Sequence, residues 1–427
     1  MLKEFLKYVS LNIFSMLGVS VYVLCDTYFI ANGIGTDALS GLNLVLPYFA
    51  FICAIGLMIG MGTATRYSIL SGQNRKIEAE RVIIHGTVLA IVSGIIISIV
   101  GYINTKRIAL LMGADKSLIN YAADYIGTIF LFAWALIGNQ LFLCITRAVG
   151  HPKIAMIASL ISSLSNIFMD IIFIYYFKLG NFGAALASGL APFLAILLQF
   201  YYFIFIKRYF DFKLCKIRLR KLIDICCLGF PSFVTEVATG LVMACFNFKI
   251  LELAGNIGVA AYSIIANIAI VVAAMFTGVA QGIQPLISFN YGAGKNNLVK
   301  QVSRYAYVTT AIMSIISYIL FYIYSKDIIN AFNKDNNLNL ISMADMGIKV
   351  YYLCLIFMGA NIVTTSILAS KEKSGRSFML SICRAGLLTI PLLFLLSNYF
   401  GIVGVWATIP LTEAITMIIF HCYSTEK

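Results

Sequence analysis

The sequence predicts an all-α membrane protein whose twelve transmembrane helices form two six-helix bundles related by pseudo-two-fold symmetry. Three observations predict this fold class. Of the 427 residues, 61% are apolar and only 11% are charged, whereas a soluble domain carries about 25% charged residues. The mean hydropathy is +0.92, and the apolar residues form continuous runs long enough to span a bilayer, which takes about 20 residues per helix. Segments of the first half recur in the second half.

Twelve apolar runs are bounded by charged residues or by Gly and Asn, and each is long enough for one crossing. They lie at 8–31, 38–70, 82–104, 120–147, 153–177, 183–206, 223–252, 258–291, 301–325, 345–370, 376–397 and 401–423. Because the runs are continuous, they exclude an outer-membrane barrel, whose strands are alternating segments of about ten residues. No small-residue cleavage site follows the first run, so we expect an uncleaved first span rather than a signal peptide.

The basic residues predict the orientation of the chain. There are 31 Lys and Arg against 18 Asp and Glu, a net charge of +13. In a soluble protein this excess would indicate nucleic acid, but here the cations lie between apolar runs, so we expect a lipid bilayer and no nucleic acid as partner. Loops on one side hold about eighteen cations and those on the other about six, which predicts a multi-pass plasma-membrane protein with both termini in the cytoplasm.

The longest basic stretch lies at the midpoint of the chain, from Lys207 to Lys221. We therefore predict an N-lobe at 1–206, a basic cytoplasmic linker at 207–222 and a C-lobe at 223–427, and we keep these names for the three ranges.

The two lobes carry repeated segments. Gly62–Val82 aligns without a gap with Gly282–Val302, and we call the constant spacing between the two segments the repeat offset. Gly180–Ser188 resembles Phe400–Thr408 at the same offset. Weak internal symmetry of this kind is typical of transporters built from two bundles. Since each half has an even number of helices, the repeats run parallel, and we expect a substrate path between them.

Carboxylates within the apolar runs predict a functional site, because an ionisable group in a bilayer costs several kcal/mol. Asp26 lies in the first run and Asp170 in the fifth. Tyr22 and Asn166 lie one helical turn before them, on the same faces. A carboxylate in a low dielectric can be neutral at one face of the membrane and ionised at the other, as ion coupling requires. The alternative is a structural hydrogen bond between helices.

A second set of polar residues lies in the C-lobe runs: Glu236, Asn247, Arg384 and Glu413. Arg384 and Lys249 lie deep enough to pair with an acid, either Glu413 or Glu236, and the sequence leaves the pairing open. We treat the four residues of this set as a candidate C-lobe polar site. For the two glutamates, a structural hydrogen bond is again the alternative.

No motif of an enzyme is present, neither GxSxG, HExxH nor a phosphate-binding glycine loop. The sequence therefore predicts a transporter driven by an ion gradient or by a downhill substrate rather than by ATP. The ten cysteines and three histidines are scattered without a CxxC, which predicts no metal cluster and no cofactor. Either H⁺ or Na⁺ could be the coupling ion, and Na⁺ could bind at Asp26 and Asp170.

Several segments resemble the multidrug and toxic compound extrusion (MATE) transporters. They are Asp26–Pro47, Asn166–Ser188, Pro231–Ile250 and Gly278–Lys295, while Ser366–Leu396 is similar to the subgroup that includes the staphylococcal multidrug exporter. The resemblance covers essentially the whole chain. It implies a V-shaped pair of six-helix lobes that expels lipophilic cations in exchange for protons or sodium ions.

The resemblance also implies a set of site residues, since a polar cluster in the N-lobe of this family couples ion to substrate. Its members fall on Asp26, Asn166, Asp170 and Ser188, with Tyr22 before the first aspartate as in the subgroup. Ser188 stands where Thr is common, which keeps the hydroxyl.

Two positions depart from the family pattern. The usual proline early in helix 1 is absent from Ser10–Phe14, so a mechanism that bends the helix there is in doubt. A glutamate of helix 7 in another branch of the family lies about one turn away from Glu236, so we do not carry its role over.

We therefore expect a monomeric, ion-coupled antiporter that exports lipophilic, cationic drugs or metabolites by alternating access. The alternative is a flippase for a lipid-linked oligosaccharide from the same broader superfamily. Such a protein tends to carry cations in its central cavity to meet pyrophosphate, whereas the cluster predicted here is acidic.

Overall fold

The computed structural model describes residues 1–34, 36–111, 119–203, 216–332 and 337–424, and these ranges are helical nearly throughout, without a strand. The first half contains α1 (Leu2–Gly33), α2 (Thr36–Gly72), α3 (Lys76–Ile103), α4 (Thr105–Leu111), α5 (Ile119–Leu131), α6 (Ala133–Ala148), α7 (Pro152–Asp170), the π-helical η1 (Ile171–Tyr176) and α8 (Gly180–Tyr201). The second half contains α9 (Leu219–Gly292), α10 (Asn296–Ile323), α11 (Ser325–Phe332), α12 (Leu338–Tyr351), η3 (Tyr352–Cys354), α13 (Leu355–Ser370), α14 (Ser374–Ile382), the π-helical η4 (Cys383–Leu387) and α15 (Thr389–Ser424).

Within the described ranges, nine helical segments are long and apolar enough to cross a bilayer, and α5 with α6, bent by 51°, form a tenth. Two of the nine segments are longer than a single crossing requires. The 74 residues of α9 would extend roughly 110 Å as one straight helix, but Gly255 has non-helical backbone angles, as does Gly401 within α15. Both breaks coincide with boundaries between predicted runs. The all-helical membrane fold is thus confirmed, while the total of twelve crossings stays a prediction.

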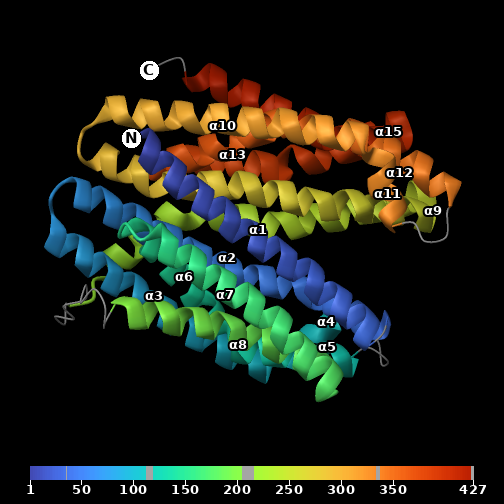
Figure 1. Ribbon diagram of the computed structural model, residues 1–427, viewed down its shortest axis with the longest axis horizontal. Helices are drawn as coiled ribbons and strands as arrows, with labels where there is room; N and C mark the ends of the chain where they lie inside the picture. The colour runs from blue at the N-terminus through green and yellow to red at the C-terminus, as the bar shows by residue number, and fades with distance from the viewer. Residues whose placement is uncertain (35, 112–118, 204–215, 333–336, 425–427) are drawn as a thin grey trace.

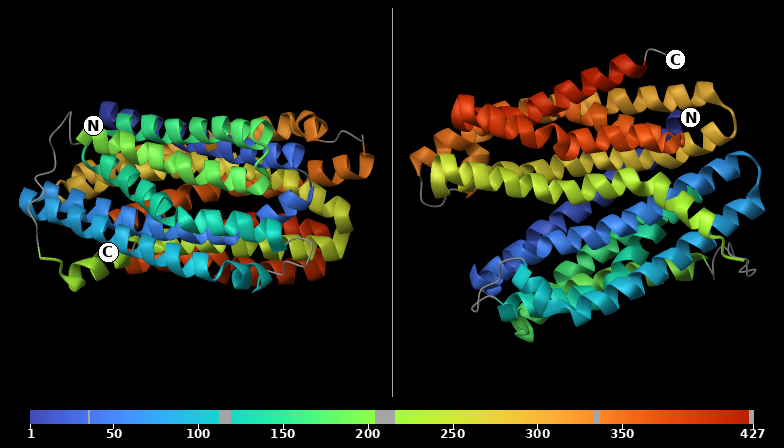
Figure 2. Two further views of the ribbon diagram at one scale, coloured as in Figure 1. Left: turned by 90° about the horizontal axis from the view of Figure 1, so that it is seen from below. Right: turned by 180° about the vertical axis from the view of Figure 1, so that it is seen from behind.

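The helices form two groups, one from each half of the chain (Figure 1). The ribbons of the two groups approach each other at the end that carries the N-terminus and the turns after α2 and α9, and they diverge toward the opposite end, as the back view in Figure 2 also shows. We call the first of these the basic end, because its turns carry Arg75, Lys295 and Lys373. Residues 207–215 of the predicted linker lie outside the described residues, and the domain boundaries stay a prediction.

The first helix of each half packs on the opposite group at the basic end. Phe5 of α1, 1% exposed, lies in a hydrophobic cluster with Val279 and Ile283 of the C-lobe. Ile225 of α9, also 1% exposed, lies in the main cluster of the N-lobe. Phe5 and Ile225 are separated by the repeat offset. The two contacts are therefore symmetric: the first helix of each half packs on the other lobe, and apolar side chains from both halves are buried between the lobes.

One close backbone approach between the lobes is made by two glycines of the repeat. A Cβ atom on Gly72, at the end of α2, would overlap the carbonyl oxygen of Phe289, and one on Gly292, at the end of α9, would overlap the carbonyl oxygen of Ile69. Gly72 and Gly292 are related by the repeat offset, and so are Ile69 and Phe289. The contact is thus self-complementary about the pseudo-two-fold axis. Only glycine allows it.

Polar contacts reinforce this approach. The buried amide of Gln284 on α9 donates to the Thr65 hydroxyl on α2 at 2.8 Å, and the Arg66 guanidinium forms an ion pair with Glu372 in the turn after α13. A buried hydrogen bond between the lobes contributes about 1 kcal/mol, and the half-exposed ion pair contributes less. Apolar burial and the glycine contact therefore dominate the interface.

The turns that follow the repeat preserve its register. Asn74 and Gly294 are again separated by the repeat offset, and both have positive φ angles, 61° and 71°. The second repeated segment is shifted by one residue relative to the sequence alignment, because the left-handed Gly180 (φ 59°) corresponds to the left-handed Gly401 (φ 57°). Each of these two glycines begins a G-x-x-G segment.

We expect Gly72→Ala and Gly292→Ala to destabilise the closed basic end to the same extent, because the two contacts are symmetric. Overpacking a tight contact costs about 1–3 kcal/mol, so the midpoint of thermal unfolding in detergent should fall in both variants. Gly240→Ala is the matched control, since no atom lies within 4 Å of a Cβ there, and alanine favours the helix by up to about 1 kcal/mol. Midpoints equal to that of the wild type in both variants would contradict the contact.

Candidate functional site

The four polar residues predicted in the N-lobe gather in one buried place. Asp26 comes from α1, Asn166 and Asp170 from α7, and Ser188 from α8. Their exposed fractions are 9%, 2%, 0% and 7%. We call these four residues the N-lobe cluster. The distant helix α1 and the consecutive helices α7 and α8 thus bring acidic, amide and hydroxyl groups together in a buried place.

Hydrogen bonds link α7 to α8 within this cluster. With its oxygen and nitrogen each turned to a complementary group, the amide of Asn166 donates to Oδ2 of Asp170 at 3.3 Å and accepts from the hydroxyl of Ser188 at 3.3 Å. Asn166 and Asp170 lie on one helical face because they are four residues apart. The amide therefore orients the Asp170 carboxyl group.

The two carboxyl groups of the cluster lie close enough to interact with each other. Oδ1 of Asp26 and Oδ1 of Asp170 are buried and have no hydrogen-bond partner in the part of the chain that the structure describes. Two adjacent carboxylates repel strongly in a low dielectric, so such a pair favours a shared proton or a bound cation. The arrangement can therefore exchange a proton for a positively charged ligand.

The backbone changes its helical register directly after Asp170. There α7 ends and the π-helical η1 begins. A π-helical turn inserts an additional residue into the turn and is frequent at functional sites. It leaves the Asn166–Asp170 face intact and changes the direction of the side chains that follow. Helix α1, which carries Asp26, is continuous over 32 residues. It contains no proline, in agreement with the absence of the family's usual proline from Ser10–Phe14.

Two tyrosines adjoin the cluster, and only one was predicted. Tyr22 is half-buried on α1 and interacts electrostatically with Asp26 and Asp170. Tyr125 of α5 is 3% exposed and interacts with Ser188. Sequence reasoning missed Tyr125 because it is one of 24 tyrosines, and the sequence does not show which of them adjoins the cluster.

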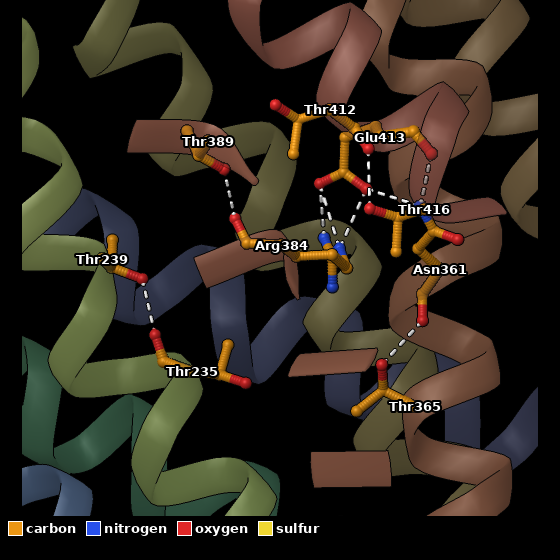
Figure 3. A network of polar contacts seen from close by, with 9 residues as sticks. All are labelled: Thr235, Thr239, Asn361, Thr365, Arg384, Thr389, Thr412, Glu413 and Thr416. Atoms are coloured by element: carbon orange, nitrogen blue, oxygen red, sulfur yellow. Dashed lines mark hydrogen bonds and ion pairs between the residues drawn. The ribbon is translucent and has the colours of Figure 1, made fainter. Parts of the chain in front are cut away.

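In the C-lobe, the structure pairs Arg384 of η4 with Glu413 of α15 (Figure 3). The guanidinium donates from Nη2 to Oε1 at 2.8 Å and from Nε to Oε2 at 2.9 Å. The amide of Asn361 on α13 also donates to Oε2 of Glu413, at 2.6 Å. Sequence reasoning left the partner of Arg384 open and missed Asn361, an isolated amide in an apolar run.

The other two residues of the candidate C-lobe polar site do not join this ion pair. Glu236 lies within electrostatic reach of Tyr22 and Cys53, so it faces the N-lobe. Asn247 is half-buried on α9. Lys249 donates to Glu252 at 3.0 Å and is therefore not the partner of Glu236 or Glu413. The four predicted residues belong to at least two separate places.

In the described ranges, no group of three or more His, Cys, Asp and Glu side chains could hold a metal ion. The N-lobe cluster offers carboxyl, amide and hydroxyl oxygens, which are the ligands preferred by hard cations. The chemistry of the cluster thus suits a proton or a small alkali cation.

The comparisons with known proteins agree with this architecture. The model of the MatE family matches residues 12–172 and 231–395, and the starts of the two matches are separated by nearly the repeat offset. The chain is 27% identical over 412 residues to "Multidrug export protein MepA" of Staphylococcus saprophyticus, covering 95% of this chain and 89% of the relative. It is 28% identical over 420 residues to the protein of that name from Staphylococcus haemolyticus, covering 97% and 91%.

Solved structures show the same fold. "Outward-facing conformation of a multidrug resistance MATE family transporter of the MOP superfamily" matches with a TM-score of 0.93 at 21% identity, over 99% of this chain and 94% of that one. "Crystal structure of MATE in the straight conformation" matches with a TM-score of 0.91 at 22% identity, over 99% and 94%.

The family and the names of the relatives describe transporters, which confirms the prediction of a transporter rather than an enzyme. The resemblance found in the sequence is confirmed as well. Because the family model matches well over half of the chain, the protein belongs to the MatE family of multi-pass membrane transporters.

Proposed function

We propose that this protein is a proton-coupled antiporter that exports lipophilic cations by alternating access. The observation that carries the proposal is the buried pair of interacting carboxyl groups, Asp26 and Asp170. Two relatives named multidrug export proteins, at 27% and 28% identity, support export of drugs or metabolites as the activity.

The coupling follows because protons and the cationic substrate compete for the negative charge of the Asp26–Asp170 pair. When the pair is ionised, it attracts a cationic substrate in a low dielectric. When protons arrive from the other side of the membrane, they remove that charge and release the substrate. Asn166 and Ser188 hold Asp170 in place through both states, since an amide and a hydroxyl can pair with either form of a carboxyl group.

The orientation is part of the same proposal. We propose that the basic end faces the cytoplasm, with both chain termini there, and that the diverging end faces outward in the plasma membrane. Burial, with the nearby charges of Lys373 and Lys300, lowers the pKa of Lys371, and this crowding of cations supports a cytoplasmic position beside anionic headgroups. A TM-score of 0.93 to a structure described as outward-facing supports the same direction.

A flippase for lipid-linked oligosaccharide is the less favoured function. Pyrophosphate needs cationic partners, and the N-lobe cluster holds two carboxyl groups and no cation among its members. The proposed antiporter acts as a monomer on a small-molecule substrate, without a cofactor.

We expect Asp26→Asn to abolish export, because an amide can neither exchange a proton nor hold a cation by charge. Ethidium transport into inverted membrane vesicles should fall more than tenfold, to the level of vesicles without the protein. Asp327→Asn is the matched control, since Asp327 is an exposed carboxylate of α11, in the other lobe. Both variants should be present in the membrane in wild-type amounts. Transport by Asp26→Asn at the wild-type rate would refute the assignment.

The coupling ion is tested by the imposed gradient. In inverted vesicles, an acidic lumen without sodium should drive ethidium accumulation, whereas a sodium-loaded lumen at equal pH should not. Accumulation driven by sodium alone would overturn proton coupling and assign Na⁺ to Asp26 and Asp170. The absence of transport of any cationic dye under both gradients would overturn the export of lipophilic cations.

A further inference from the structure

The C-lobe contains a cavity of about 230 Å³ that the proposed coupling does not use. Residues from α9, α12, η3, α13, α14, η4 and α15 line it, and most of them are apolar or aromatic, including Tyr262, Tyr351 and Met243. Its charged lining residues are Arg384 and Glu413. A mostly apolar cavity with a few convergent polar groups is the usual form of a small-molecule site.

The guanidinium of Arg384 has hydrogen-bonding capacity left over. Its inner edge, Nε and Nη2, bonds to Glu413, and Oε2 of that carboxylate also accepts from Asn361. Nη1 has no hydrogen bond to any residue that the structure describes, and Figure 3 shows this nitrogen pointing away from Glu413. Of the five donors of a guanidinium, those on the outer edge thus remain to be satisfied.

The surrounding groups hold this edge in position. The hydroxyl of Thr389 donates to the carbonyl oxygen of Arg384 at 2.6 Å, a carbonyl in the π-helical η4. Asn361 donates both to the carboxylate and, at 2.9 Å, to the backbone carbonyl of Glu413. A side chain fixed from both ends loses little entropy on binding a ligand. The ion pair is neutral as a whole, so the cavity presents donors rather than net negative charge.

We propose that this C-lobe cavity is a second ligand site, which binds flat aromatic compounds that carry a carbonyl or carboxylate oxygen. The outer edge of Arg384 receives the oxygen, since a guanidinium fork matches a planar acceptor, and the aromatic ring lies among the tyrosines. The proposal rests on the proposed function only in naming a second class of substrate, because binding itself is measured without transport. In this proposal the N-lobe cluster binds cationic ligands, whereas the C-lobe cavity binds ligands that carry a hydrogen-bond acceptor oxygen.

The chain contains its own reporter for this cavity. Of its two tryptophans, Trp406 is fully buried in the C-lobe and stacks on Tyr262, with ring centroids 6.3 Å apart. Trp134 lies in the N-lobe beside Phe193. The variant Trp134→Phe therefore leaves a single tryptophan that packs on a wall residue of the cavity.

We expect 7-methoxycoumarin-3-carboxylate to quench Trp406 saturably in Trp134→Phe protein, by energy transfer to the bound coumarin. Arg384→Gln should weaken binding at least tenfold. Lys249→Gln is the matched control, because Lys249 is a buried cation of the same lobe that does not line the cavity, and binding should stay at the wild-type level there. Asp26→Asn should also bind normally, which separates this site from the proposed coupling site.

Arg384→Gln leaves Glu413 buried without its partner, which can destabilise the protein strongly. Arg384→Gln combined with Glu413→Gln removes both charges while keeping the shape of the side chains. This double variant should fold, and its affinity for the coumarin should still be at least tenfold weaker than that of the wild type. Two results would overturn the proposal: the absence of saturable quenching in Trp134→Phe protein, or wild-type affinity in the double variant. Tighter binding of the same coumarin bearing a trimethylammonium group in place of the carboxylate would overturn it as well.

Discussion

The close approach of two backbones at Gly72 and Gly292 is the constraint on which the rest of the structure depends. Each glycine packs against a carbonyl oxygen of the other lobe, and the first helix of each lobe buries its start in the opposite lobe. The lobes are therefore joined at the basic end and diverge from there. At these two positions the lobes meet through backbone atoms, which leaves no room for a side chain.

The two lobes share a backbone plan but not a chemistry. At the position that the repeat offset pairs with Asp26, the C-lobe has Phe246, which is 1% exposed and stacks on Tyr262. The N-lobe thus buries an acid where the C-lobe buries an aromatic ring. The C-lobe has an ion pair of its own, between Arg384 and Glu413. Symmetry supplies two similar scaffolds, and the substituted side chains make one acidic and the other neutral.

Local spacing along single helices was readable before the fold was known. Asn166 and Asp170 share a helical face whatever surrounds them, and a carboxylate in an apolar run is costly enough to indicate a function. Contacts between helices were not readable in this way. How distant helices pack decides that Asp26 lies near Asp170 and that Arg384 pairs with Glu413 rather than with Glu236. It also decides that Tyr125 adjoins the N-lobe cluster and that Asn361 joins the ion pair.

The sequence by itself determined the membrane location, the helical class and the two-fold repeat, because these follow from apolar run length and from a constant offset, which are properties of the chain. It also identified the acids of the N-lobe cluster, since a carboxylate within an apolar run is visible in the chain itself. Only the tertiary structure decided which charges meet, why Gly72 and Gly292 are glycines, and that a cavity lies beside Arg384. These depend on distances between segments far apart in sequence, where a shift of one helical turn would exchange one partner for another.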